Sequence, residues 1–213
     1  SLNAINSLEN TYLKADFNDP EGLKVKLEEH LLKIGNVNIL VNNTGGPPGG
    51  SLLESKLEAF FDAYKMHLAC NHVLMQAVIG GMKSESYGRI INIISTSVKV
   101  PLKGLGVSNT TRGAVASWAK TLANELGVSE ITVNNVLPGA TKTARLKGII
   151  EAKSKKTGQS EEAISSSMLS EIPMGRFGEA EEIASLVGFL ASPSAAYISG
   201  TSIPVDGGRT GAL

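Results

Sequence analysis

The stretch NVNILVNNTGG, residues 36–46, decides the fold that the sequence predicts. Its apolar run is short and continuous, which is typical of a parallel strand covered on both faces of its sheet. Asparagines, a threonine and glycines follow at the point where the strand would end. The stretch therefore predicts a buried strand whose end is built from small polar residues.

Segments of the same kind recur along the chain and alternate with helical patterns. Further strands are predicted at 11–16, 88–95, 131–137 and 201–206. Helices are predicted at 20–34, 55–83, 107–127, 145–171 and 179–191. This alternation predicts a single α/β domain over residues 1–213, built on a doubly wound parallel sheet. Its most polar part, 153–168, is either a surface helix pair or a mobile lid over a site.

Composition excludes several classes of function. The 20 Lys and Arg residues balance the 20 Asp and Glu residues, so no net charge attracts nucleic acid or an anionic membrane. No apolar run approaches the ~20 residues of a membrane span, and SLNAINSLEN does not resemble a signal peptide. The single cysteine, Cys70, fits a small core residue better than a nucleophile. We expect a cytoplasmic protein without a metal site that acts on a small molecule.

Small and polar residues follow four of the predicted strands. They are NNTGGPPGG, STS, PGATKT and DGG, in chain order. Ligands of doubly wound sheets bind beyond the carboxyl ends of the strands, and glycine lets the backbone approach a ligand closely. One such loop is ordinary turn chemistry. Four of them at one edge of a sheet predict a binding site.

Longer motifs match a known family. They are KADF with Asp16, NNTG at 42–45, GRIINIIS at 88–95, NNVLPG at 134–139, and IPMGRFGEAEEIASLVGFLAS…YISGTSIPVDGG at 172–208. Through them nearly the whole chain resembles the short-chain dehydrogenase/reductase family, in particular its 3-oxoacyl-(acyl-carrier-protein) reductase and glucose dehydrogenase branch. The resemblance implies a Rossmann-like fold, an NAD or NADP cofactor, and reduction of a carbonyl or oxidation of an alcohol.

The resemblance also implies which residues bind the cofactor and how the protein assembles. Asp16 would lie by the adenine, with Asn42 and Gly45 along the adenosine. The residues expected around the nicotinamide carboxamide are Pro138, Gly139, Thr141 and Thr143. Family members assemble through helices that match 55–83 and 107–127, so a homotetramer or homodimer is implied.

The beginning of the sequence departs from the family pattern. The family opens with a strand and a glycine-rich loop that binds the cofactor pyrophosphate, whereas Gly22 is the one glycine before Gly35 here. We therefore expect that an N-terminal βαβ portion of roughly 30 or more residues is missing, by truncation or disorder. Residues 1–213 alone are expected to bind NAD(P) weakly or not at all, and they do not decide between NAD and NADP.

A second departure concerns the catalytic residues. Ser95 matches the family's catalytic serine, and a gap-free alignment from it brings Ser108 and Arg112 to the family's tyrosine and lysine. In the family, the tyrosine donates a proton to the developing alkoxide while the lysine lowers its pKa and holds the nicotinamide ribose. A serine hydroxyl is a far weaker acid than a phenol of pKa ~10. Arg112 keeps a permanent charge that can hold ribose hydroxyls or bind a carboxylate or phosphate of the substrate.

His67 is the third exchange, because it matches the family's helix asparagine. An imidazole of pKa ~6.5 can act as an acid at neutral pH. Alternatively, His67 only fills the space of the asparagine. Three sources of the proton therefore remain possible: water, Ser108 acting through water, or His67. Two functions remain open as well: an NAD(P)-dependent oxidoreductase with a non-standard proton donor, or a catalytically silent protein that binds the cofactor or serves as a scaffold.

Overall fold

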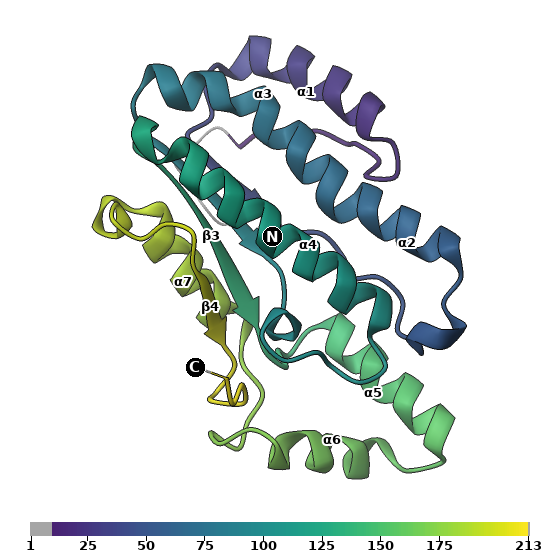
Figure 1. Cartoon of the computed structure of the whole chain (residues 1–213). Helices are drawn as coiled ribbons and strands as arrows, with labels where there is room; N and C mark the ends of the chain where they lie inside the picture. The colour runs from purple at the N-terminus through teal and green to yellow at the C-terminus, as the bar shows by residue number, and fades with distance from the viewer. Residues whose placement is uncertain (1–9, 213) are drawn as a thin grey trace.

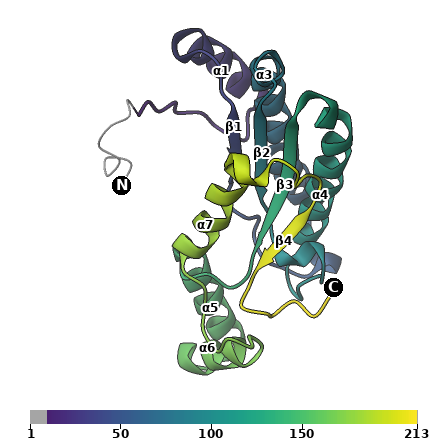
Figure 2. The same ribbon diagram turned by 90° about the vertical axis from the view of Figure 1, so that its left-hand side faces the viewer.

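The computed structural model describes residues 10–212, which form a parallel sheet with helices on both faces (Figure 1). The strands are β1 (Ile39–Asn42), β2 (Gly88–Ile93), β3 (Ile131–Pro138) and β4 (Ser202–Val205), all parallel and adjacent in chain order. Figure 2 shows the four strands side by side in that order. The predicted doubly wound α/β fold is confirmed.

The strand predicted at 11–16 is wrong. These residues run without regular structure as far as a turn at Phe17 and Asn18, after which α1 (Pro20–Ile34) begins. Within the described residues no neighbouring strand pairs with them, and a β-branched segment forms a strand only where its backbone finds such a partner. The start of α1 agrees with its sequence, since the side chain of Asp19 accepts a hydrogen bond of 3.0 Å from the backbone N–H of Gly22.

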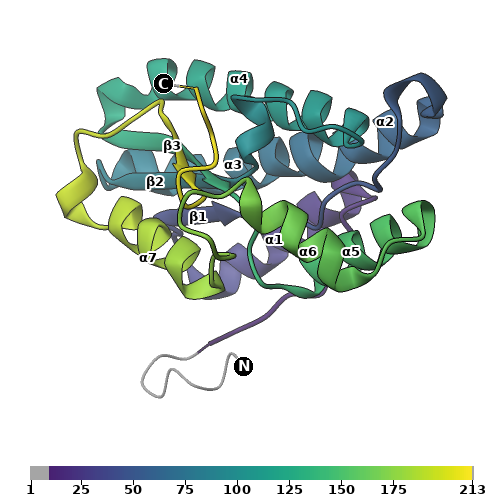
Figure 3. The same ribbon diagram turned by 90° about the horizontal axis from the view of Figure 1, so that it is seen from below.

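Helices cover the sheet in two layers. On one face lie α1, α3 (Cys70–Ser84) and α4 (Gly106–Leu126), and on the other lies α7 (Ala180–Ala191), as Figure 3 shows. Adjacent residues of β2 serve the two layers: Ile90 packs against α3 and α4, and Ile91 packs with Leu190 of α7. Successive strand residues point to opposite faces, so a strand between two helical layers buries side chains on both of its faces.

The helix predicted over 55–83 is interrupted. It consists of α2 (Leu57–Tyr64), a π-helical turn at Lys65–Ala69, and α3. A π-helical turn inserts an extra residue into a helix, and such turns occur frequently at functional sites. Here the turn carries His67, whose side chain is buried.

Two further helices extend beyond the carboxyl ends of the strands (Figure 1). They are α5 (Ala144–Thr157) and α6 (Glu161–Ser170), which pack together through Leu146, Ile150 and Ile164. The polar segment 153–168 is therefore a helix pair, and its role as a lid stays a prediction. Within residues 10–212 no helix has the length and apolar character needed to cross a membrane.

A row of polar side chains links all four strands, from the carboxyl end of β1 to the beginning of β4. Asn42 Nδ2 donates to Asn92 Oδ1 at 2.8 Å, and Asn92 Nδ2 donates to Asn135 Oδ1 at 2.9 Å. Asn135 Nδ2 in turn donates to Ser202 Oγ at 3.1 Å. These four residues are partners in the strand register, so their side chains stand next to one another on one face of the sheet. The row fixes the register of the four strands that carry the site.

Candidate active site

The loops that follow the four strands meet at one edge of the sheet. The backbone N–H of Gly139, after β3, donates to the carbonyl of Val205 in β4 at 2.9 Å. A Cβ on Gly139 would lie 2.6 Å from the Cβ of Asp206, so only glycine fits at this crossing. The predicted gathering of small and polar residues at this edge is confirmed.

Ser95 lies directly beyond β2. Its side-chain oxygen accepts a hydrogen bond of 3.1 Å from the backbone N–H of Ser97 and thereby caps the short helical turn Thr96–Val98. Its hydroxyl proton remains available as a donor, because a hydroxyl both accepts and donates. The hydroxyl is therefore held in one place and is able to polarise an oxygen atom of a ligand.

Ser108 and Arg112 lie one turn apart on the buried face of α4, and they are 6% and 8% exposed. Arg112 Nη1 donates a hydrogen bond of 2.8 Å to the carbonyl oxygen of Ile93, two residues before Ser95. Burial and the nearby charge of Arg145 lower the pKa of Arg112 to about 10, so its guanidinium is still charged at neutral pH. The structure thus brings a positive charge to the end of β2.

His67 reaches the same region from the π-helical turn. Its side chain is 2% exposed, and its Nδ1 lies 2.5 Å from the hydroxyl of Thr44 in the loop after β1. Its Nε2 is buried without a hydrogen-bond partner in the described part of the chain. Burial, together with the charges of Arg112 and Arg145, lowers the pKa of His67 to about 4. The imidazole is therefore neutral at pH 7.

Arg145 joins the site from the first turn of α5, a role that sequence reasoning missed. Its Nη1 and Nη2 donate to the carbonyl oxygens of Gly46 and Pro47 at 3.0 and 2.8 Å. These acceptors are backbone atoms almost one hundred residues away in the chain, so no motif pointed to them. A Cβ on Gly46 would lie 2.8 Å from Arg145 Nη2, which shows how closely the guanidinium covers this loop.

The residues expected to hold a cofactor differ in how far they are free to do so. Thr141 donates to the carbonyl of Gly139 at 3.2 Å, and Thr143 caps α5 by accepting from the N–H of Leu146 at 3.4 Å. The amide nitrogen of Asn42 is used in the row of asparagines, while its Oδ1 is buried without a partner among residues 10–212. Gly45 faces open space, since nothing lies within 4 Å of the position of a Cβ.

Asp16 lies at the exposed beginning of the described chain. Its carboxylate accepts hydrogen bonds from the backbone and side chain of Asn18, at 2.9 and 3.0 Å. Burial, followed by the charges of Asp16 and Asp19, raises the pKa of Cys70 to about 11. Cys70 is thus a protonated thiol in the core, which agrees with a structural role. Because the charge of Asp16 contributes to the raised pKa of Cys70, the first residue of α3, Asp16 lies near the start of that helix.

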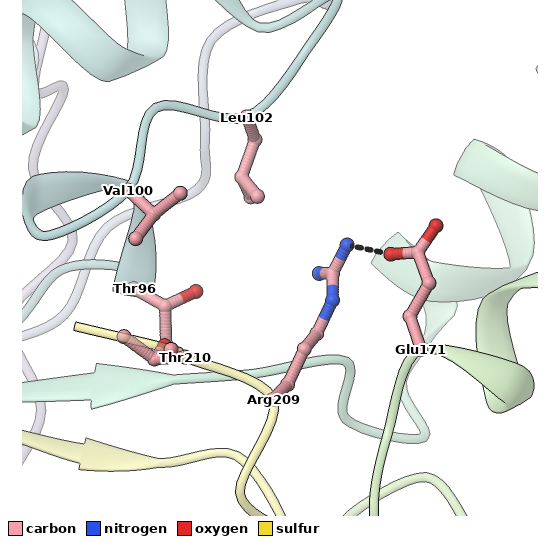
Figure 4. Close-up of a pocket in the computed structure, with 7 residues that line it drawn as sticks. Thr96, Val100, Leu102, Glu171, Arg209 and Thr210 are labelled. Atoms are coloured by element: carbon pink, nitrogen blue, oxygen red, sulfur yellow. Dashed lines mark hydrogen bonds and ion pairs between the residues drawn. The ribbon is translucent and has the colours of Figure 1, made fainter.

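A cavity of about 200 Å³ opens beside the Ser95 loop (Figure 4). Thr96, Val100 and Leu102 line one side of it. On the other side Arg209, from the C-terminal segment, points toward Glu171 at the end of α6, and their ion pair measures 2.5 Å. The pair joins the α5–α6 hairpin to the segment that follows β4.

Known proteins resemble this chain over most of its length. A family model described as enoyl-(acyl carrier protein) reductase matches residues 2–210. The 3-oxoacyl-(acyl-carrier-protein) reductase FabG of Pseudomonas aeruginosa is 35% identical over 205 residues, which cover 95% of this chain and 78% of that protein. The chain belongs to the short-chain dehydrogenase/reductase family.

Other relatives of this short-chain dehydrogenase/reductase extend the similarity. A putative ketoacyl reductase of the monensin polyketide synthase from Streptomyces virginiae is 32% identical and covers 91% of this chain and 75% of that protein. Among solved structures, the NADPH-dependent reductase YwfH is 28% identical with a TM-score of 0.88, covering 94% and 78% of the two chains. L-sorbose reductase from Gluconobacter frateurii, complexed with NADPH and L-sorbose, is 29% identical with a TM-score of 0.85, covering 93% and 76%.

The strand-end residues of this reductase fold fit the nicotinamide part of a dinucleotide. The segment from Pro138 to Thr143 offers hydroxyl groups and backbone polar groups at the end of β3, as a carboxamide requires. Arg112 supplies donors beside Ser95, and Gly45 leaves open space at the end of β1. Oxidoreductases of this family and a nicotinamide cofactor therefore suit the chemistry of these residues.

None of the four tyrosines stands in for the family's catalytic tyrosine within the described site. Tyr12, Tyr64 and Tyr197 are 86%, 54% and 104% exposed. Tyr87 donates its hydroxyl proton to the carbonyl of Ala191 at 2.9 Å, at the start of β2 and therefore at the opposite end of the sheet from Ser95. Among the described residues, no hydrogen bond joins a tyrosine hydroxyl to Ser95 or Ser108.

Proposed function

We propose that this protein is an NAD(P)-dependent oxidoreductase that reduces a carbonyl to an alcohol, in the manner of a 3-oxoacyl-(acyl-carrier-protein) reductase, or catalyses the reverse oxidation. The observation that carries the proposal is the 2.8 Å hydrogen bond from Arg112 to the carbonyl of Ile93, beside Ser95. It supports a site in which a hydroxyl donor and a fixed positive charge face the same substrate oxygen.

Ser95 has the role of orienting the substrate. Its hydroxyl donates a hydrogen bond to the carbonyl oxygen and draws electron density from the carbonyl carbon. The capping bond from the N–H of Ser97 holds the hydroxyl in place before the substrate binds, so little reorganisation accompanies the reaction. This role does not depend on the exchange of the tyrosine.

Arg112 has the role of stabilising negative charge on that oxygen as the alkoxide develops. Its guanidinium is buried and remains charged at neutral pH, and a charge in a poorly solvated site acts more strongly than one in water. Its remaining N–H groups are also suited to hold the ribose of the cofactor, together with Asn42, Gly45 and the segment 138–143. When bound, the cofactor supplies the hydride.

The proton comes from water, and Ser108 and His67 guide it. A serine hydroxyl is too weak an acid to serve as its source, but it can pass a proton between water and the alkoxide. His67 is neutral at pH 7, so it acts as a relay through its two ring nitrogens rather than as the stored acid. The absence of general-acid catalysis typically lowers a reaction rate by about 10²–10⁴-fold, so the enzyme is expected to be slow but its activity measurable.

A steady-state screen tests the proposal. The purified full-length protein is assayed with NADH and with NADPH against acetoacetyl thioesters, sugars and small ketones. We expect turnover with at least one pair, a strong loss in Ser95→Ala, and little change in Thr110→Ala, an exposed hydroxyl on the same helix as Ser108. No turnover with any pair contradicts the proposal. Fluorescence titration then distinguishes a silent cofactor-binding protein, which retains NADH or NADPH affinity, from a scaffold that binds neither.

A further inference from the structure

Arg112 is a buried cation without an anionic partner. The described chain gives it one hydrogen-bond acceptor, the carbonyl of Ile93, and none of the ion pairs among residues 10–212 includes it. Arg89, the other buried arginine of the described residues, donates to the carbonyls of Gly88 and Glu130 and lies 4.4 Å from the ring centre of Tyr87, although its Nε has no partner there. A buried guanidinium is normally compensated in this way or by a carboxylate. Arg112 is not.

Arg145 adds a second positive charge to the same place. Its two hydrogen bonds to Gly46 and Pro47 fix its guanidinium over the loop after β1. It is close enough to lower the pKa of both Arg112 and His67. Unlike Arg112, it is exposed, and three of its five N–H groups remain beyond those two bonds. The guanidinium groups of Arg112 and Arg145 repel each other, and an anion that binds between them relieves this repulsion.

The unpartnered Nε2 of His67 completes the arrangement. Thr44 and Gly46 are two residues apart, so one loop holds His67 through a side chain and Arg145 through backbone carbonyls. Within the described residues this centre consists of Arg112, Arg145 and His67, and no carboxylate is paired with it. Both guanidinium groups are suited to a ligand that carries negative charge, and Nε2 of His67 joins them in the tautomer that places the imidazole proton on Nε2.

We propose that this cationic centre binds a carboxylate of the substrate, which makes small oxo acids the preferred substrates of the enzyme. The inference rests on the proposed function and narrows its substrate class. Because Arg112 also adjoins Ser95, the carboxylate and the carbonyl that is reduced lie close together in the substrate, as in a 3-oxo acid. The carbonyl carbon gains hydride from NAD(P)H, which becomes NAD(P)⁺, and the oxygen gains a proton from water. The carboxylate is unchanged.

Matched substrates test the inference, because acetoacetate and its ethyl ester share the 3-oxo group and differ in charge. We expect a kcat/KM that is at least about tenfold higher for acetoacetate, as a charge-assisted bidentate contact supports. Arg145→Gln lowers the ratio of kcat/KM for acetoacetate to kcat/KM for the ester about tenfold, and Arg145→Lys lowers this ratio less. Lys147→Gln, an exposed cation two residues along the same helix, leaves the preference unchanged. An Arg145→Gln enzyme with the preference of the native protein overturns the inference.

Binding measurements separate this inference from the proposed function. In calorimetric titrations, 3-hydroxybutanoate is expected to bind more tightly than its ethyl ester, and Arg145→Gln abolishes the difference. If the protein turns over no substrate but retains this preference, the proposed function fails and the anion site stands. If ester and acid are reduced equally well, the anion site fails and the proposed function stands. Affinity for NADH or NADPH is expected to be unaffected by Arg145→Gln, and a tenfold loss there assigns the site to the cofactor phosphates instead.

Discussion

Arg112 and Ile93 join the helix and the strand that carry the catalytic candidates: the guanidinium donates a 2.8 Å hydrogen bond to the carbonyl two residues before Ser95. This contact holds a charge in a buried site where hydrophobic packing would be more stable. Proteins keep such locally unfavourable features where function requires them. Arg112 is therefore the residue at which activity and stability are expected to oppose each other.

Replacement of Arg112 by methionine tests this opposition. A methionine of similar length fills the space without a buried charge, so the free energy of unfolding stays the same or rises by about 1 kcal/mol. Loss of the charge that stabilises the alkoxide lowers kcat/KM by about 10²–10³-fold. Urea unfolding and steady-state rates measure the two effects. A loss of stability above about 3 kcal/mol shows that Arg112 is a structural residue.

A pH dependence of stability follows from His67. Its pKa is lowered from 6.5 to about 4 in the folded protein, so the unfolded chain binds more protons between these two values. Stability is complete above pH 6.5 and is lost as pH falls toward 4, by about 3 kcal/mol from this group. The charges that face His67 are Arg112 of α4 and Arg145 of α5.

Unfolding in urea between pH 4 and pH 7 measures this loss, with His67→Asn as the variant that removes it. The matched control is His72→Asn, because His72 lies one turn further along α3, where its ring contacts Trp118. The native slope persisting in His67→Asn would falsify the assignment. The asparagine variant also tests whether the relay depends on an imidazole, since its rate in the proposed reaction is expected to fall.

The row of asparagines predicts a structural effect at a distance from the chemistry. Asn92→Ala removes two side-chain hydrogen bonds and leaves the buried Nδ2 of Asn42 and the buried Oδ1 of Asn135 without partners. Each buried group left unsatisfied costs about 1–3 kcal/mol, so a loss of about 2–6 kcal/mol is expected. Asn124→Ala, at an exposed position of α4, serves as the control and changes stability by less than about 0.5 kcal/mol. Equal unfolding midpoints for the two variants contradict the role of the row.

The sequence predicted the elements that depend on local residue pattern. It did not predict the features that depend on contacts between residues far apart in the chain. The strands from 36 to 206 follow from short strand-like runs that alternate with helical patterns, whereas 11–16 resembles such a run and lacks a neighbouring strand within the described residues. The helix over 55–83 was predicted to be continuous because apolar spacing does not reveal the π-helical turn at Lys65–Ala69. The resemblance to the family pointed to Ser95, Ser108 and Arg112, but not to Arg145, since Arg145 binds backbone carbonyls that carry no sequence signal.

The ion pair of Glu171 and Arg209 predicts an effect on substrate binding. It joins the α5–α6 hairpin to the C-terminal segment across the cavity beside the Ser95 loop. Glu171 is more than half exposed in this pair, so Glu171→Gln changes the free energy of unfolding by less than about 1 kcal/mol. If the hairpin closes over the substrate, loss of the pair raises KM several-fold and leaves kcat nearly unchanged, because the catalytic residues lie on other elements. Glu151→Gln breaks an exposed pair with Lys147 within α5 and leaves KM unaffected. A KM for Glu171→Gln equal to that of the native protein shows that the hairpin is a fixed part of the fold rather than a lid.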